Sequence, residues 1–257
     1  MPELQCSSAN ILLRSLAPHD WRTLAPYLQR IVVRPGAVLC EQYTPIDTVF
    51  FPETAVTSLS ERNGDAAAEI AMIGCDGMVG WPIILGSQEA FHRVVVRLDG
   101  GTALACPAAR LMRLCAGSDT LAATLLRYVQ SITRQFARSI VANLSAPVEA
   151  RLARWVLMLH DRAPGDTLSV THQELAGFLG VRRASVTDCL HILEGERMLR
   201  CTRGRIDILD RGQLQDRAGG TYGVAEQAYR ELIGPFGKSR NAAPRSALPA
   251  QPVFIGA

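Results

Sequence analysis

The side chains best suited to chemistry in this sequence are arginines and short polar residues that gather between residues 171 and 205. Five of them are the arginines Arg182, Arg183, Arg200, Arg203 and Arg205. A guanidinium can donate two parallel hydrogen bonds, either to phosphate oxygens or to O6 and N7 of a guanine. This stretch therefore predicts contacts with nucleic acid.

The spacing around these arginines is typical of a helix-turn-helix. Thr171 can cap a first helix, with Glu174 three residues later as in a capping box. Gly180 suits the tight turn that follows, because it carries no Cβ. Val186 and Leu190 then lie on the inner face of a second helix. In such motifs the N-terminal half of the second helix enters the major groove.

Each polar residue of the motif has an expected role on double-stranded DNA. Arg183 would read a guanine, Ala184 can contact only apolar groups such as a thymine methyl, and Asp188 either accepts from cytosine N4 or repels phosphate. A hairpin with a turn at Arg203–Gly204 would form a wing whose arginines lie along a phosphate backbone. The candidate DNA-binding residues are Thr171, His172, Arg182, Arg183, Ala184, Ser185, Thr187, Asp188, Arg200, Arg203 and Arg205. The alternative is an ordinary helix pair and hairpin, solvated by arginine or used for protein contacts.

Short runs rich in Val, Ile and Phe precede this motif, between residues 30 and 106. They alternate with turn residues, and Asn63–Gly64 between two of them is a hairpin signal. Strands of this length and interval predict an antiparallel sandwich or jelly roll. The runs are Ile31–Arg34, Val38–Glu41, Thr48–Phe51, Val56–Glu61, Ala68–Ile73, Arg93–Leu98 and Thr102–Cys106.

The segment between the strands and the motif is helical. Residues 120–144 contain no Gly or Pro and predict one long helix. A small sandwich cannot easily cover the apolar stripe of such a helix, so a second copy of the chain is expected to cover it. The expected dimerisation residues are Leu121, Leu125, Tyr128, Ile132 and Phe136. The alternative is a helix that packs wholly within its own subunit.

Composition limits the other classes of function. The chain has 257 residues, 48% of them hydrophobic, and a net charge of +3, so global charge says little about partners. Seven cysteines without a CxxC spacing argue against disulfides and structural zinc. No GxSxG, HExxH or phosphate-loop pattern is present, so we expect no enzyme, no cofactor and no metal. No signal peptide or spanning segment is evident, and we expect a cytoplasmic protein without a membrane partner.

Over residues 10–233 the sequence resembles the Crp/Fnr family of bacterial regulators. The resemblance rests on the motif QELAGFLGVRRASVTDCLHILE, the wing RGRIDIL, and the N-terminal segments RPGAVL, VFFPETAVTSL, EIAMIGCDGMVG and VVVRLDGGTALA. It implies a cyclic-nucleotide-binding-like jelly roll, a dimerising helix and a winged helix. It further implies a homodimer on an inverted-repeat DNA site, with RNA polymerase as a partner.

The sequence also departs from the family members that bind cAMP. Those members carry a Glu after the glycine of the phosphate cassette and an Arg–Ser pair shortly after. Here Trp81 follows Gly80, and His92–Arg93 stands at the pair. We therefore expect no cAMP binding, and Gly80, Trp81, His92 and Arg93 remain the candidate pocket for an unknown effector. Only Cys6 lies where oxygen-sensing members cluster cysteines, so an iron–sulfur cluster is not expected.

Together these patterns predict an α+β chain with four parts. An N-terminal antiparallel β jelly roll occupies residues 10–118, a dimerisation helix 119–145 and a winged helix-turn-helix 147–233. Residues 237–257 are rich in Ala, Pro, Ser and Gly and are expected to form a disordered tail. The predicted function is sequence-specific DNA binding by a transcription regulator. A sensor whose winged helix serves protein contacts is the alternative.

Overall fold

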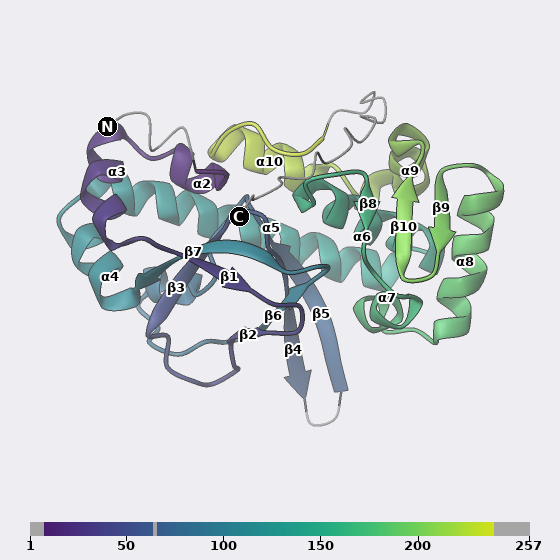
Figure 1. The fold of residues 1–257 in the computed structure, drawn as a ribbon, viewed down its shortest axis with the longest axis horizontal. Coiled ribbons are helices and arrows are strands. Elements are labelled where there is room, and N and C mark those ends of the chain that lie inside the picture. Colours follow the sequence, from purple (N-terminus) through teal and green to yellow (C-terminus); the bar gives the residue numbers. More distant parts are fainter. Residues whose placement is uncertain (1–7, 64–65, 239–257) are drawn as a thin grey trace, which may run out of the picture.

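The computed structural model of the chain describes residues 8–63 and 66–238 (Figure 1). Two short helices, α2 (Ile11–Arg14) and α3 (Pro18–Leu24), open it. Asn10 caps α2 by accepting from the backbone N–H of Leu13. Its side-chain amide also donates to the carbonyls of Pro52 at 2.7 Å and Gly77 at 2.9 Å. This one buried amide therefore fastens the N-terminal helices to the strands.

The predicted antiparallel jelly roll is confirmed. The described strands of this part form one sheet in the order β1-β7-β3 and another in the order β2-β6-β4-β5, with antiparallel pairing throughout. The strands are β1 (Gln29–Val33), β2 (Val38–Cys40), β3 (Thr48–Pro52), β4 (Val56–Asn63), β5 (Ala66–Ile73), β6 (Arg93–Arg97) and β7 (Gly101–Pro107). Strands β4 and β5 pair as far as Asn63 and Ala66, as a hairpin requires. The expected turn residue Gly64 lies outside the described residues.

A long helix, α5 (Asp119–Ser145), runs along the sandwich after α4 (Ala108–Ala116) (Figure 1). Its residues Leu121, Leu125, Tyr128 and Ile132 are at most 2% exposed and belong to the core of their own jelly roll. Phe136 is partly buried against the same core. The prediction that these five residues face a second subunit is therefore wrong, because β5, α4 and a C-terminal helix together cover the stripe.

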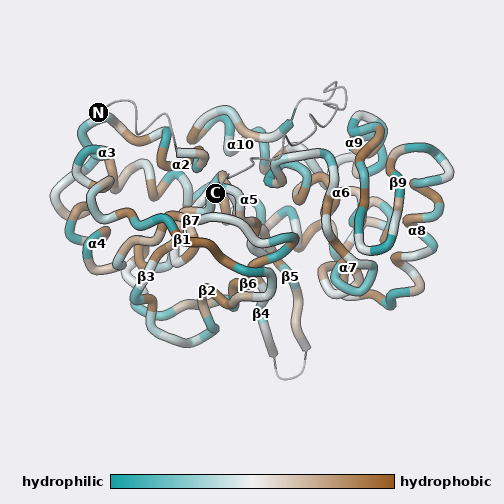
Figure 2. The backbone as a smooth tube through the Cα atoms, viewed as in Figure 1, coloured by the Kyte–Doolittle hydropathy of each residue, from teal (hydrophilic) through white to brown (hydrophobic). Residues whose placement is uncertain are grey.

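The C-terminal part folds around a second core. Its elements are α6 (Val148–Arg162), β8 (Thr167–Leu168), α7 (His172–Leu179), α8 (Arg183–Gly195), β9 (Leu199–Thr202), β10 (Arg205–Ile208) and α9 (Arg211–Ala218). Leu175, Val186 and Leu190 are fully buried in this core, and the Trp155 ring stacks on Phe178 at 5.4 Å. The three short strands form a sheet in the order β8-β10-β9. Figure 2 shows that the loop joining β9 to β10 is hydrophilic.

The chain then returns to the N-terminal part. After the 3-10 turn η3 (Gly219–Thr221), helix α10 (Val224–Leu232) packs on α5, and Tyr229 and Phe236 enter the core of the jelly roll. The packed chain continues to Lys238, whose backbone N–H donates to Asp161 at 3.1 Å. The expected tail therefore does not begin at residue 237, and residues 239–257 lie outside the described part. Among the described helices, none is both long enough and apolar enough to cross a membrane.

Candidate DNA interface

The predicted helix-turn-helix is present, and its local chemistry explains its shape. Thr171 Oγ1 accepts from the backbone of Glu174 at 3.2 Å, and the Glu174 carboxylate accepts from the backbone of Thr171 at 2.8 Å, which completes the capping box. Gly180 ends α7 with a φ of 63°, a left-handed conformation that favours glycine. The chain then turns and α8 begins at Arg183.

Helix α8 packs on one side and leaves the other open. Val186, Leu190 and Leu193 are fully buried on its inner face. On its outer face the candidate residues near the N-terminus are exposed, namely Arg182, Arg183, Ala184 and Asp188, with Ser185 and Thr187 half-buried. The first half of α8 therefore projects from the surface as a helix entering a DNA groove would have to.

A side-chain contact ties the two helices together at this surface. Thr187 Oγ1 donates to the carbonyl of Arg183 at 3.1 Å, so its contact with His172 Nδ1 at 2.9 Å has the imidazole as the donor. These bonds use Nδ1 and leave Nε2 as the ring nitrogen for a ligand. Partial burial lowers the pKa of His172, and the nearby charges of Arg183 and His191 lower it further.

The predicted wing stands beside α8. Strands β9 and β10 pair from Leu199 with Ile208 to Thr202 with Arg205, and Gly204 has a φ of 72° in the turn between them. Arg200, Arg203 and Arg205 are all exposed. The backbone N–H of Cys201 donates to Glu194 at 2.8 Å, which fixes the wing against α8.

A cleft of about 710 Å³ lies between the wing and α8, and it brings together residues from three elements. Predicted residues in its lining are Thr171, His172, Arg183 and Arg203. The sequence reasoning missed His191, Glu194, Cys201, Thr202 and Gly204, which also line it. His191 follows Arg183 and Thr187 at four-residue steps, and that helical spacing could have revealed it. The cleft offers several hydrogen-bond donors to an anionic backbone, with one carboxylate that is already engaged by the wing.

The candidate effector pocket is filled by the side chains that were expected to line it. Trp81 is 6% exposed, and its ring lies 6.0 Å from Phe136 and 6.2 Å from His92. The remaining cavity beside Gly80 and Trp81 measures about 10 Å³. That is about the volume of one water, whereas small-molecule sites need on the order of several hundred Å³. Arg93 points elsewhere and pairs with Glu41 at 3.0 Å near the surface.

Burial raises the pKa of every described cysteine thiol above its ordinary value. Burial raises the pKa of the Cys75 thiol to about 11, with Asp76 as a secondary cause, so this thiol is protonated at neutral pH. No three His, Cys, Asp or Glu side chains of the described chain lie together as a metal site requires.

Helix α5 does present a stripe to solvent on the face opposite to the one expected, with four apolar members and the polar Gln130 and Thr133. Its members follow one another at alternating steps of four and three residues, the pattern of a two-helix seam. They are Leu126, Gln130, Thr133, Ala137, Ile140 and Leu144, and all are exposed. We call this set the outer stripe. The sequence prediction placed the dimer seam on the other side of the helix instead.

Comparisons with known proteins agree with this architecture. Residues 150–217 match the model of the Crp-like helix-turn-helix domain. FixK2 from Bradyrhizobium japonicum is 14% identical, with 75% of this chain and 98% of that chain covered and a TM-score of 0.64. A Crp/Fnr-family regulator from Eubacterium rectale is 16% identical, with 80% and 97% covered and a TM-score of 0.62.

A third similar structure is that of CLP from Xanthomonas campestris, which is described as a c-di-GMP responsive global regulator. It is 15% identical, with 75% of this chain and 99% of that chain covered and a TM-score of 0.60. A comparison with curated protein sequences found no significant match. Residues 150–217 are therefore a Crp-like helix-turn-helix domain, and the 75–80% of the chain that the first two structures cover shares their fold.

Proposed function

We propose that this protein is a transcription regulator that binds a specific site on double-stranded DNA as a homodimer. The observation that carries the proposal is the open outer face of α8 beside the basic wing, with the cleft between them. Arg183 reads a guanine in the major groove, while Arg200, Arg203 and Arg205 hold the phosphate backbone. His172, in its protonated form, adds a phosphate contact through Nε2–H at the start of α7.

Dimerisation through the outer stripe of α5 supports this function. A seam of two such helices buries Leu126, Ile140 and Leu144 of each copy, which are 47%, 59% and 84% exposed in the single chain. A two-fold dimer presents two copies of α8 and requires an inverted-repeat site, with half-sites about 34 Å apart on one side of the duplex. We propose that the bound dimer acts on RNA polymerase in the cytoplasm.

The same proposal assigns a role to each part of the chain. Residues 10–118 form the jelly-roll domain, 119–145 the dimerisation helix and 147–238 the DNA-binding part with its C-terminal extension. The filled pocket at Trp81 supports the loss of cAMP binding, because a nucleotide has no room there.

Selection of bound duplexes from a random library tests the function, followed by affinity measurements on the selected site. Arg183→Ala should relax the preference at one base pair and weaken the selected site by about 1–3 kcal/mol. Arg203→Ala should weaken all sequences alike and reduce the salt dependence of binding by about one ion. Arg113→Ala, which removes an exposed arginine from α4, is the matched control and should change neither. A wild-type protein that selects no sequence at any salt concentration refutes the function. In that case the winged helix serves protein contacts instead.

A further inference from the structure

A buried ion pair joins a turn of the jelly roll to helix α6 of the DNA-binding part. Asp76 lies in the turn after β5, and Arg162 ends α6. The guanidinium donates to both carboxylate oxygens, at 3.0 and 2.5 Å, and the two side chains are only 2% and 6% exposed. A Cβ on Gly74 would lie 2.9 Å from the Arg162 side chain, and one on Gly77 would lie 2.4 Å from the Tyr128 hydroxyl. The turn is therefore clamped between α6 and α5 without spare room.

The chain beyond α9 adds a second fastening, and we call residues 219–238 the C-terminal strap. Arg154 of α6 joins it to α5, since it donates to the carbonyl of Thr221 and to Ser139 Oγ, both at 3.0 Å. Farther along, Tyr229 and Phe236 are 3% and 7% exposed within the core of the jelly roll. The strap thus begins at the winged helix, enters the core of the jelly roll through Tyr229 and Phe236, and returns to Asp161 of α6 at Lys238.

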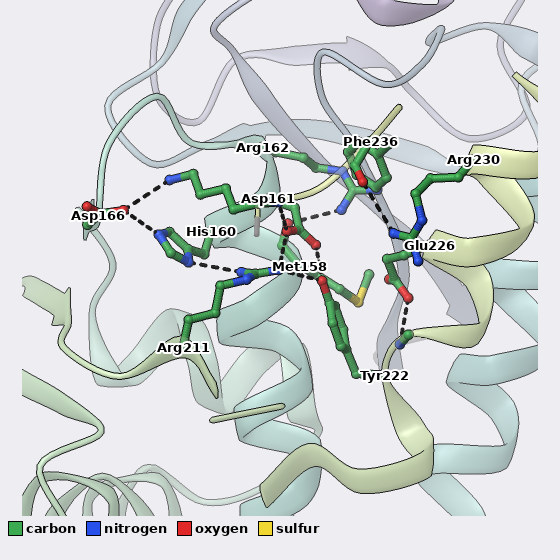
Figure 3. Close-up of polar contacts among 12 residues, drawn as sticks. Met158, His160, Asp161, Arg162, Asp166, Arg211, Tyr222, Glu226, Arg230 and Phe236 are labelled. Carbon is green, nitrogen blue, oxygen red and sulfur yellow. Dashed lines mark hydrogen bonds and ion pairs between the residues drawn. The ribbon is translucent and has the colours of Figure 1, made fainter. Parts of the chain in front are cut away.

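Asp161 is the centre of the polar network that holds the strap (Figure 3). Its carboxylate accepts from Arg211 and from the Tyr222 hydroxyl, each at 2.5 Å, and from the backbone of Lys238. Arg211 also donates to His160 Nδ1 at 3.0 Å, so the imidazole is neutral and donates through Nε2 to Asp166 at 2.8 Å. Asp161 and Arg211 are buried and paired with each other, so opening of this network would leave two buried charges unpaired.

The two domains also share an apolar and a cationic contact away from the strap. Val56 and Met72 of the jelly roll belong to the core of the DNA-binding part. The Arg97 guanidinium lies 5.2 Å above the Phe178 ring of α7, while it pairs with Glu69 at 2.5 Å. Helix α7 therefore packs directly on the sheet that contains β5 and β6. This packing leaves the outer face of α8 exposed.

We propose that these fastenings hold the DNA-binding part in one position, open to DNA, and that the protein binds its site without a cyclic-nucleotide effector. The inference rests on the proposed function and concerns its regulation. A ligand can shift two arrangements only by the difference of its affinities for them, and a full switch needs a difference of about ten-thousand-fold. Here Trp81 leaves only about 10 Å³ in the candidate nucleotide pocket beside Gly80, and the second arrangement would have to break the buried ion pair of Asp76 with Arg162. The jelly roll therefore serves as a fixed support for the dimer.

The first experiment measures the affinity of the full-length wild-type protein for its selected DNA site by fluorescence anisotropy. The titration is repeated with millimolar cAMP, cGMP or cyclic di-GMP. The dissociation constant should change by less than about twofold, since a ligand without differential affinity shifts nothing. An increase in affinity of about tenfold or more with any of these nucleotides overturns the inference and leaves the proposed function standing. Absence of DNA binding in all conditions removes the function, and the inference falls with it.

The second experiment tests the strap by variants that keep the fold. Tyr222→Phe removes one hydrogen bond to Asp161 and keeps the ring, and Phe236→Ala loosens the end of the strap. Gln227→Ala, on the exposed side of α10, is the matched control. If the strap positions the DNA-binding part, the first two variants should bind DNA about three- to tenfold more weakly, because a smaller fraction is competent. Circular dichroism confirms that each variant is folded. Folded variants with unchanged DNA affinity overturn the positioning role.

Discussion

Replacing Ile140 by Glu should separate the dimer while each chain stays folded. Ile140 lies on the outer stripe of α5 and is 59% exposed, so the single chain gains little from it. Complete burial of an aliphatic side chain contributes about 2 kcal/mol, so the exposed part is worth about 1.2 kcal/mol in each copy. A two-fold interface contains Ile140 from both copies, so this burial energy is lost twice. The two glutamates that replace them add a desolvation cost of about 1–3 kcal/mol. The variant should therefore lose about 4 kcal/mol, a thousandfold rise in the dimer dissociation constant.

Sedimentation equilibrium over a range of protein concentrations measures this change directly. Val32→Glu is the matched control, because Val32 is 80% exposed on β1 of the jelly roll and lies on no proposed interface. The control should remain dimeric, and Ile140→Glu should also bind a full inverted repeat no better than a half-site. A variant that stays as dimeric as the wild type refutes the outer stripe as the interface. A wild type that is monomeric at all concentrations refutes dimerisation itself.

Three further changes test the interior and the DNA surface. Asp76→Ala leaves Arg162 buried without its partner, so it should lower the free energy of unfolding, measured in urea, by about 3–5 kcal/mol. Glu41→Ala, at an exposed ion pair, should lower it by less than about 1 kcal/mol. Equal losses in the two variants would contradict the role of the buried pair. Burial lowers the pKa of His160 from 6.5 to about 4, so below pH 6.5 the unfolded chain takes up a proton that the folded one refuses. The wild type should therefore lose up to about 3 kcal/mol of stability between pH 6.5 and 4, and His160→Gln should lack this portion of the loss. The lowered pKa of His172 rises again when a phosphate binds Nε2, so DNA affinity should increase as the pH falls toward the pKa of this imidazole, and His172→Gln should remove that increase.

The elements of the candidate DNA interface could be predicted because their signals are local. A capping box, a turn glycine and a helical spacing each depend on a few consecutive residues, and the structure places Arg183 and Arg203 on one cleft as expected. The strands could also be predicted from the sequence, since each carries its own run of β-branched and aromatic residues between turns. Helix α9 was missed because its residues Arg211–Ala218 are mostly polar and show no apolar periodicity.

The direction in which α5 faces could not be read in the same way. The helix has apolar residues on two sides, and both sides repeat at three- and four-residue steps. The sequence prediction assigns the side with Leu121, Leu125 and Tyr128 to a partner, because a small sandwich was not expected to cover it. In the tertiary structure that side packs on the chain's own jelly roll, since burial of its larger apolar area is more favourable than burial of the outer stripe. Only the weaker stripe remains for a second copy.

The amino-acid sequence by itself determined the order of the elements, the turn chemistry of the helix-turn-helix and the arginines that face outward. These depend on backbone preferences and periodicities that act within a few residues. The tertiary structure alone decided which face of α5 is free, that Trp81 occupies the pocket, and that the chain beyond residue 219 crosses back to the jelly roll. Those outcomes depend on contacts between segments far apart in the chain, such as Asp76 with Arg162, and no local pattern records them.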